Sequence, residues 1–170
     1  MVVQVRVLGL ALDEAGQHVL LVKPLGEPSG TGRMLPIWIG SLEATSIMVA
    51  LQGTPVPRPL AHDLMRSLLQ GAGAAVERVE ITRIDEGTYY AEITLVTALG
   101  TRAVDARPSD AVALATRVGA PIWVADDVME EAGIPDLTPA DDDEDLPDEE
   151  ERVDEFKRFL NDVDPEDFRG

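Results

Sequence analysis

The sequence contains no cysteine and few aromatic residues, which make up 4% of the chain. The absence of cysteine excludes a disulfide framework, a thiolate zinc site and a cysteine nucleophile. Aliphatic side chains must therefore fill any core. No run of 18 apolar residues is long enough to span a membrane, and Arg6 interrupts the N-terminal apolar run, which lacks a signal-peptide cleavage pattern. We expect a soluble, cytoplasmic protein that does not bind membranes.

Basic residues are also scarce, and the net charge of −18 is unevenly distributed. Residues 136–170 hold 16 acidic and 4 basic residues, a net charge of −12, whereas residues 1–135 carry −6. The stretch "TPADDDEDLPDEEE" has almost no apolar content, which is typical of a disordered tether. The sequence predicts a folded domain at 1–135, an acidic disordered linker at 136–150 and a short amphipathic helical tail at 151–170.

The apolar residues of the tail recur at helical spacing: Val153, Phe156, Phe159, Leu160 and Val163. This segment is either a helix that packs on its own domain or a mobile segment that docks on a protein partner or on the surface of the domain, and the flexible tether favours the mobile segment. We also hypothesise that the acidic tail mimics nucleic acid and covers a site on the domain. The alternative is that it only keeps the protein soluble or binds another protein.

Within the first 135 residues, short strands alternate with short helices. Period-two patterns predict strands at 3–7, 18–23, 34–40, 76–84, 88–96, 101–106 and 121–124. Helical spacing predicts helices at 42–52, with Ser41 as N-cap, and at 59–70, 109–118 and 126–133. The turn Asp85-Glu86-Gly87 predicts a hairpin. This mixture predicts an α+β fold with a mixed β-sheet.

A weak internal repeat appears when the chain is shifted by 67 residues. The segment "IWIGSLEATSIMVAL" then lies over "VDARPSDAVALATRV", with Glu43 on Asp110. Each copy reads as a strand, a turn and a helix with an acidic residue in its first turn. We predict a tandem pseudo-repeat of strand–strand–helix units, with Glu43 and Asp110 at equivalent positions.

Two segments carry residues suited to chemistry, and both contain Arg-Pro. They are "RPLAHDL", at 58–64, and "DARPSD", at 105–110. A residue before proline is held extended, so Arg58 and Arg107 are expected to have defined directions. Structural alternatives remain open, because Asp105 and Arg107 can form a salt bridge on one strand face. Acidic residues in first helical turns are also stabilised by the helix dipole.

These segments resemble a known family. "RMLPIWIGSLEATSI", "RPLAHDL", "YYAEITL" and "VDARPSDAVALATRVGAPIWV" resemble, in order, the successive blocks of the bifunctional nuclease domain family. The resemblance covers about residues 1–135, and the "DARPSDAxALA" block is its most specific part. It implies an α/β-type domain with a mixed sheet and a nuclease that acts on DNA, RNA or both. It supplies no agreed catalytic set.

Phosphodiester hydrolysis needs an activated water and positive charge that offsets the charge of the phosphate. For a divalent cation, Mg²⁺ or Mn²⁺, the predicted ligands are Glu43, Asp105 and Asp110. His62 is the predicted general base or acid, and Asp63 completes the catalytic set. The predicted phosphate-binding residues are Arg33, Arg58 and Arg107.

The charge of the chain favours a different class of function. Nucleic-acid affinity usually comes from Lys and Arg, but the only lysines are Lys23 and Lys157 and there is no basic stripe. The alternative is a non-enzymatic, oligomeric binding or regulatory module that acts through its acidic tail. Trp38 and Trp123, in short apolar strands, predict a homo-oligomer, although both indoles equally suit a core.

Overall fold

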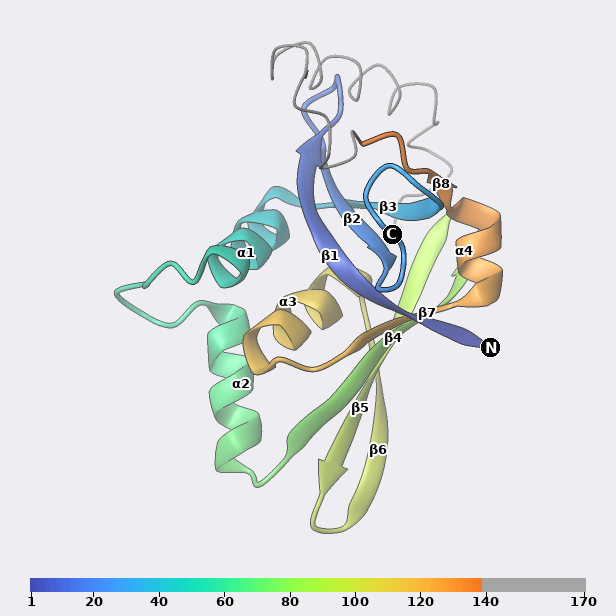
Figure 1. Ribbon diagram of the computed structural model, residues 1–170. Helices are drawn as coiled ribbons and strands as arrows, with labels where there is room; N and C mark the ends of the chain where they lie inside the picture. Colours follow the sequence, from blue (N-terminus) through green and yellow to red (C-terminus); the bar gives the residue numbers. More distant parts are fainter. Residues whose placement is uncertain (139–170) are drawn as a thin grey trace.

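The computed structural model describes residues 1–138, which form an α+β domain with one eight-stranded mixed sheet and four helices (Figure 1). The predictions for 139–170 lie outside the described residues. The strands are β1 (Val2–Leu12), β2 (His18–Pro24), β3 (Arg33–Ile39), β4 (Ala75–Asp85), β5 (Thr88–Thr97), β6 (Gly100–Ala106), β7 (Ile122–Ala125) and β8 (Ile134–Pro135). The helices are α1 (Ser41–Gln52), α2 (Ala61–Gly71), α3 (Pro108–Val118) and α4 (Asp126–Ala132). The predicted fold class is confirmed.

The sheet order is β6-β5-β4-β7-β1-β2-β3-β8. Two antiparallel meanders, β1–β2–β3 and β4–β5–β6, flank β7, which runs antiparallel to β1 and parallel to β4. The two meanders therefore start in opposite directions, as copies related by a half-turn would. α1 follows the first meander and α3 follows the second. The predicted repeat is thus present in the order of elements, with one more strand in each unit than predicted.

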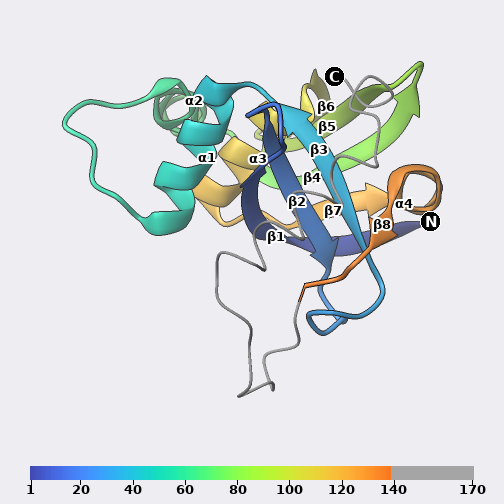
Figure 2. The same ribbon diagram turned by 90° about the horizontal axis from the view of Figure 1, so that it is seen from above.

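Helices α1, α2 and α3 gather on one side of the domain, and α4 lies on the other side, against β3, β4 and β7 (Figures 1 and 2). α3 packs on both α1 and α2 and on the strands β4 and β5. Its buried residues 111–115 are "AVALA", whose small side chains allow the helix to lie close to the sheet. This arrangement brings the first turns of three helices together.

The main core is aliphatic, as the scarcity of aromatic residues requires. Alternate residues of the central strands, such as Val79 and Ile81 of β4 and Val124 of β7, point into it. Tyr89 of β5 is its aromatic member, and its hydroxyl donates to the carbonyl oxygen of Pro36 at 3.1 Å. This bond ties the second meander to β3 across the core.

The predicted hairpin at Asp85-Glu86-Gly87 is confirmed. Asp85 pairs with Thr88 across a two-residue loop. Glu86 and Gly87 both have positive φ, 50° and 78°. Two successive residues of this kind form the turn whose twist matches that of paired strands.

A second, smaller core on the other face of β2 and β3 contains Trp38, whose indole nitrogen donates to Asp13 Oδ2 at 3.0 Å. Trp123 is half-buried, and its indole nitrogen is an enclosed side-chain atom without a hydrogen-bond partner in residues 1–138. Trp38 is therefore a core residue, and the homo-oligomer stays a prediction.

The folded domain continues past its predicted end at residue 135. Asp136 is buried and forms an ion pair with Lys23, and it also accepts a hydrogen bond from the backbone of Gly30 at 3.0 Å. Lys23 donates in addition to the carbonyl of Thr31. The segment that closes the domain is thus fastened to the loop after β2. No helix within residues 1–138 is long and apolar enough to cross a membrane.

Candidate functional site

His62 lies at the centre of a hydrogen-bonded chain that joins three helices. Its Nδ1 is 2.7 Å from Ser46 Oγ on α1, and its Nε2 is 2.9 Å from Asp110 Oδ1 on α3. His62 itself occupies the first turn of α2 and is only 5% exposed. Both ring nitrogens are therefore engaged, and the imidazole fixes the first turn of α2 against α1 and α3.

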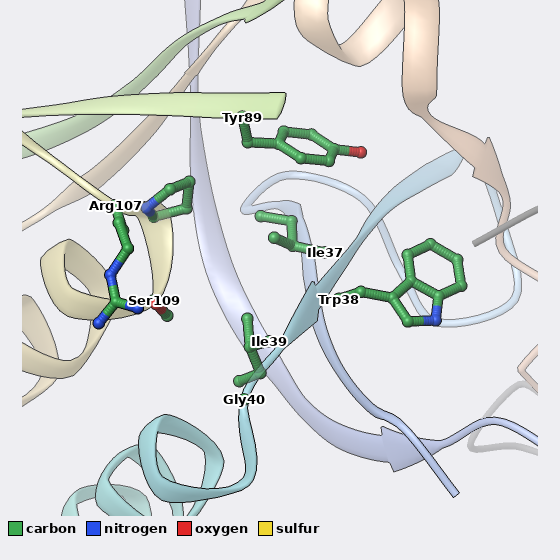
Figure 3. A pocket seen from close by; sticks show the side chains of 8 residues that line it. Ile37, Trp38, Ile39, Gly40, Tyr89, Arg107 and Ser109 are labelled. Carbon is green, nitrogen blue, oxygen red and sulfur yellow. The ribbon is translucent and has the colours of Figure 1, made fainter. Parts of the chain in front are cut away.

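Arg107 joins the acidic residues that begin α1 and α3. Its Nε lies 2.8 Å from Asp110 Oδ2, and its Nη2 lies 2.9 Å from Glu43 Oε1. Arg107 is the N-cap of α3, and Pro108 follows at the first helical position, so the backbone is extended there as predicted (φ −71°, ψ 145°). The Arg107 side chain is 61% exposed. Figure 3 shows it at the start of α3, beside Ser109.

The carboxylate of Asp110 is held in its charged form. Burial raises its pKa, but the hydrogen bonds from Arg107 and His62, with their charges, outweigh burial and leave the pKa below its ordinary value. In return, the hydrogen bond and charge of Asp110, followed by those of Glu43, raise the pKa of Arg107. We call the set Glu43, Ser46, His62, Arg107 and Asp110 the helix-start cluster.

Gly40, the N-cap of α1, makes room for this cluster. The carboxylate of Glu43 folds back so that Oε2 occupies the place where a Cβ of residue 40 would lie. A Cβ at position 40 would lie only 2.3 Å from Oε2, so the Glu43 carboxylate, which contacts Arg107 through Oε1, would have to shift. The predicted N-cap, Ser41, was wrong, because Ser41 is already the first residue of α1.

Asp63 fastens the same helices from the side. Its Oδ2 accepts a hydrogen bond from the backbone of Leu60 at 2.9 Å, and its Oδ1 lies 2.8 Å from Nε of the buried Arg117. Arg117 also donates to the carbonyl oxygen of Ser46 at 3.0 Å. Burial raises the pKa of Asp63, but the Leu60 and Arg117 hydrogen bonds bring it below its ordinary value. Asp63 thus caps its own helix, α2, and links it to α3.

The three carboxylates predicted as metal ligands do not converge. Glu43 and Asp110 are bridged by Arg107, whereas Asp105 pairs across strands with Glu92, on the sheet face opposite the core residue Ile93. Within residues 1–138, no group of three His, Asp or Glu side chains could hold a metal ion. Since a guanidinium joins the two carboxylates, this donor set does not fit a divalent cation as arranged.

The predicted phosphate clamp is also dispersed. Arg33 begins β3, at the end remote from Gly40, and its Nη1 lies 3.3 Å and 3.2 Å from two carbonyl oxygens of α4. Arg58 is exposed on the connection between α1 and α2 and forms no hydrogen bond or ion pair within the described part of the chain. Of the three arginines, only Arg107 belongs to the helix-start cluster.

Comparison with known proteins assigns the chain to a family. The sequence model of the bifunctional nuclease domain family matches residues 25–136. The chain belongs to the bifunctional nuclease domain family. An uncharacterised protein of Mycobacterium tuberculosis (strain ATCC 25618 / H37Rv) is 42% identical, over 98% of both chains.

Plant relatives carry the nuclease name. Bifunctional nuclease 1 of Oryza sativa subsp. indica is 31% identical over 70% of this chain, which spans 36% of that relative. Bifunctional nuclease 2 of Arabidopsis thaliana is 30% identical over 56% of this chain and 30% of its own length. This bifunctional nuclease domain therefore spans about a third of the plant proteins that it resembles.

All five residues of the helix-start cluster lie inside the matched range of the bifunctional nuclease domain. Ser46 and Arg117 were missed by the sequence analysis. Ser46 follows Glu43 by three positions, a spacing that places both on one side of a helix and that could have pointed to it. Arg117, in the last turn of α3, reads as an ordinary helix-terminal cation.

Proposed function

We propose that this domain hydrolyses phosphodiester bonds of DNA or RNA at the surface formed by Arg107, Glu43 and Asp110. The observation that carries the proposal is the helix-start cluster. It brings together four residues that the sequence predicted for nuclease chemistry, at the starts of three helices. They are Glu43, His62, Arg107 and Asp110. The names of the plant relatives support the same reaction class.

Arg107 is the group that meets the phosphate. Its side chain is largely exposed, and Nη1 forms no hydrogen bond within residues 1–138, so a donor remains available. A guanidinium matches the paired oxygens of a phosphate and offsets the charge that develops as the ester bond breaks. Glu43 and Asp110 hold this guanidinium in place from two sides.

Glu43 is the proposed general base. Its Oε1 is held by Arg107, and its side chain is 20% exposed, so we assign the contact with the attacking water to the other oxygen, Oε2. The water loses a proton to the carboxylate as its oxygen attacks phosphorus. The bond from phosphorus to the leaving oxygen then breaks, and this oxygen takes a proton from solvent.

Asp110 and His62 are assigned positioning roles. The lowered pKa of Asp110 keeps it ionised, which suits a group that orients Arg107 better than one that accepts protons. His62 is buried with both nitrogens occupied, so it orients Asp110 and does not reach the substrate. This assignment replaces the general-base role expected from the sequence.

The use of Mg²⁺ or Mn²⁺ stays a prediction, and no step is assigned to a cation because Arg107 bridges the available carboxylates. The test is cleavage of labelled single-stranded DNA and RNA by the full chain with Mg²⁺, Mn²⁺ or EDTA. Arg107→Gln and Glu43→Gln should each lower the cleavage rate by about 100-fold, as loss of a charge-stabilising group does. Arg102→Gln, which removes an exposed positive charge from β6, is the matched control.

Equal cleavage by the parent and both variants would show that the activity comes from another site or another protein. The second candidate function, a non-enzymatic binding module, is favoured by the net charge of −18. It is also favoured by exposed apolar residues on α2, namely Leu64, Met65 and Leu68. It predicts that the purified parent cleaves neither nucleic acid under any of the three conditions.

A further inference from the structure

A small pocket lies where the ends of the two repeat units meet. It is lined by residues 37–40 at the end of β3, by Tyr89 of β5 and by residues 107–109 at the start of α3 (Figure 3). Its volume is about 30 Å³. The Trp38 ring points away from Arg107 and Ser109, so the indole does not fill the pocket.

Both helices that start at this pocket lack a side-chain cap. Gly40 and Arg107 are the N-cap residues of α1 and α3, and neither helix start has a side-chain capping hydrogen bond. The first backbone N–H groups of a helix have no partner inside it and project from its start. In α1 these groups belong to Ser41, Leu42 and Glu43, which directly follow the lining residue Gly40; in α3 they belong to Ser109, which lines the pocket, and to Asp110, which follows it.

Ser109 gives independent support for a ligand. Its residue is 7% exposed and lines the pocket, yet its hydroxyl forms no hydrogen bond within the described part of the chain. Its oxygen is not sealed from solvent, since the enclosed orphan atom of residues 1–138 is Trp123 Nε1. The Ser109 hydroxyl is therefore available to a group that enters the pocket.

The size and chemistry of the pocket restrict that group. A volume of about 30 Å³ accepts one or two atoms of the size of a water molecule, so a base or sugar is excluded. The hydroxyl of Tyr89 already donates to Pro36, and burial, with the charge of Glu131, raises its pKa, so this wall stays neutral. What remains are N–H and O–H donors and, at the rim, Arg107.

We infer that this pocket is a phosphate subsite, in which Ser109 and the starts of α1 and α3 hold a non-bridging oxygen of the phosphate that Arg107 meets. The inference rests on the proposed function for the identity of the ligand. Paired helix starts favour negative charge there. Glu43 and Asp110 oppose it, since with Arg107 they carry a net charge of −1, so free phosphate should bind only weakly.

The two helix starts at the pocket hold equivalent places in the order of elements of the two repeat units. Each unit ends with a strand that leads into a helix, and the 67-residue shift places Gly40 on Arg107 and Leu42 on Ser109. Leu42 is 82% exposed, whereas Ser109 is buried. The second unit alone therefore supplies the guanidinium and the hydroxyl, while the first supplies the glycine that accommodates Glu43.

The test is a titration of the ¹⁵N-labelled full chain with inorganic phosphate at constant ionic strength. The measured quantity is the change in chemical shift of each backbone amide. We expect saturable shifts at residues 40–43 and at Ser109 and Asp110. Ser109→Ala should weaken binding about tenfold, as loss of a hydrogen bond to a charged group does. Ser67→Ala, whose hydroxyl bonds the carbonyl of Asp63 on α2, is the control and should bind like the parent.

The inference is wrong if phosphate shifts other amides, shifts none, or binds Ser109→Ala as well as it binds the parent. These outcomes leave the nuclease proposal intact whenever the parent cleaves DNA or RNA and Arg107→Gln does not. Conversely, phosphate binding at the pocket without cleavage under any metal condition supports the subsite and removes the nuclease proposal.

Discussion

Two ionic clusters of this domain use the same kinds of residue in opposite surroundings. Lys23 and Asp136 are both 0% exposed, and backbone groups of Gly30 and Thr31 complete their hydrogen bonds. In the helix-start cluster, Arg107 is largely exposed, and its Nη1 has no hydrogen-bond partner among residues 1–138. The first arrangement fastens one chain segment to another, whereas the second holds charged groups where a ligand can reach them.

Burial also separates the two clusters electrostatically. It raises the pKa of Asp136, but hydrogen bonds from Lys23, Thr138 and Gly30 outweigh it, so the carboxylate stays charged inside the protein. Replacing one partner of such a buried pair strongly destabilises the fold, because the other charge remains buried without a counter-charge. An exposed pair has water as a substitute partner and contributes less to stability.

The largest expected effect comes from breaking the buried pair. Asp136→Asn should lower the free energy of unfolding by about 3–5 kcal/mol, because Lys23 would remain buried without its counter-charge. The double variant Lys23→Met/Asp136→Leu should recover most of this loss. Urea unfolding measures both variants, and Asp85→Asn, in an exposed pair with Arg83, is the control with a loss below about 1 kcal/mol. If Asp136→Asn also lowered the free energy of unfolding by less than about 1 kcal/mol, the Lys23–Asp136 pair would not be important for stability.

The buried pair also marks a limit of sequence reasoning. Lys23 and Asp136 are 113 positions apart, and no local pattern connects them. A lysine among apolar strand residues and an aspartate at the edge of an acidic stretch both read as surface residues. They come together only because the 24–32 loop packs beside β8, which is a tertiary contact.

The helix-start cluster was partly readable from the sequence, because some of its contacts are local. Arg107 and Asp110 are three residues apart at a helix start, and the 67-residue repeat predicted that Glu43 and Asp110 are equivalent. His62 pairs with Asp110 across 48 positions, which no spacing rule shows. Asp105 does not join the cluster, because the strand ends at Ala106, so Arg107 reaches Glu43 of α1 while Asp105 stays on the far sheet face.

Removing His62 tests whether the exposed cluster depends on its buried part. His62→Ala removes the partner of Ser46 Oγ and of Asp110 Oδ1, while Asp110 Oδ2 keeps its contact with Arg107, and should lower the free energy of unfolding by about 1–3 kcal/mol. If the proposed function is right, kcat should fall more than KM rises. His62→Gln, whose amide can still donate to Asp110, should restore part of kcat. Equal kcat values for the Ala and Gln variants would contradict a positioning role.

The acid dependence of stability gives a smaller effect. Because the pKa of Asp110 lies below its ordinary value of 3.8, its stabilising contribution is complete above that pH and is lost as pH falls through the lower, folded-state pKa. The difference in unfolding free energy between the parent and Asp110→Asn should therefore shrink below about pH 4. Asp105→Asn, at a position without an ion pair in residues 1–138, is the control. A difference that stays constant from pH 6 to pH 2 would contradict this role.

The smallest expected effect concerns the acidic tail, which lies outside the described residues. The chain should be cut after Thr138, because this residue still donates to Asp136. Such a cut removes 15 acidic and 4 basic residues, so the net charge changes from −18 to −7. Stability should change little, whereas a cut after Pro135 removes Asp136 and should destabilise the domain as strongly as Asp136→Asn. Comparing the two truncations therefore separates the effect of losing the Lys23–Asp136 ion pair from the effect of losing the acidic tail.

With the tail removed, binding of single-stranded DNA should strengthen several-fold at low salt, because a tethered polyanion no longer competes for Arg107. The gain should shrink at physiological ionic strength, where exposed charges are screened beyond about 8 Å. A fluorescence anisotropy titration at two salt concentrations measures the gain in affinity and its dependence on salt. If the tail acts at the helix-start cluster, Arg107→Gln should abolish the gain in affinity that truncation produces. Equal affinities at low salt would rule out autoinhibition and leave the tail as a solubility element or as a segment that binds another protein.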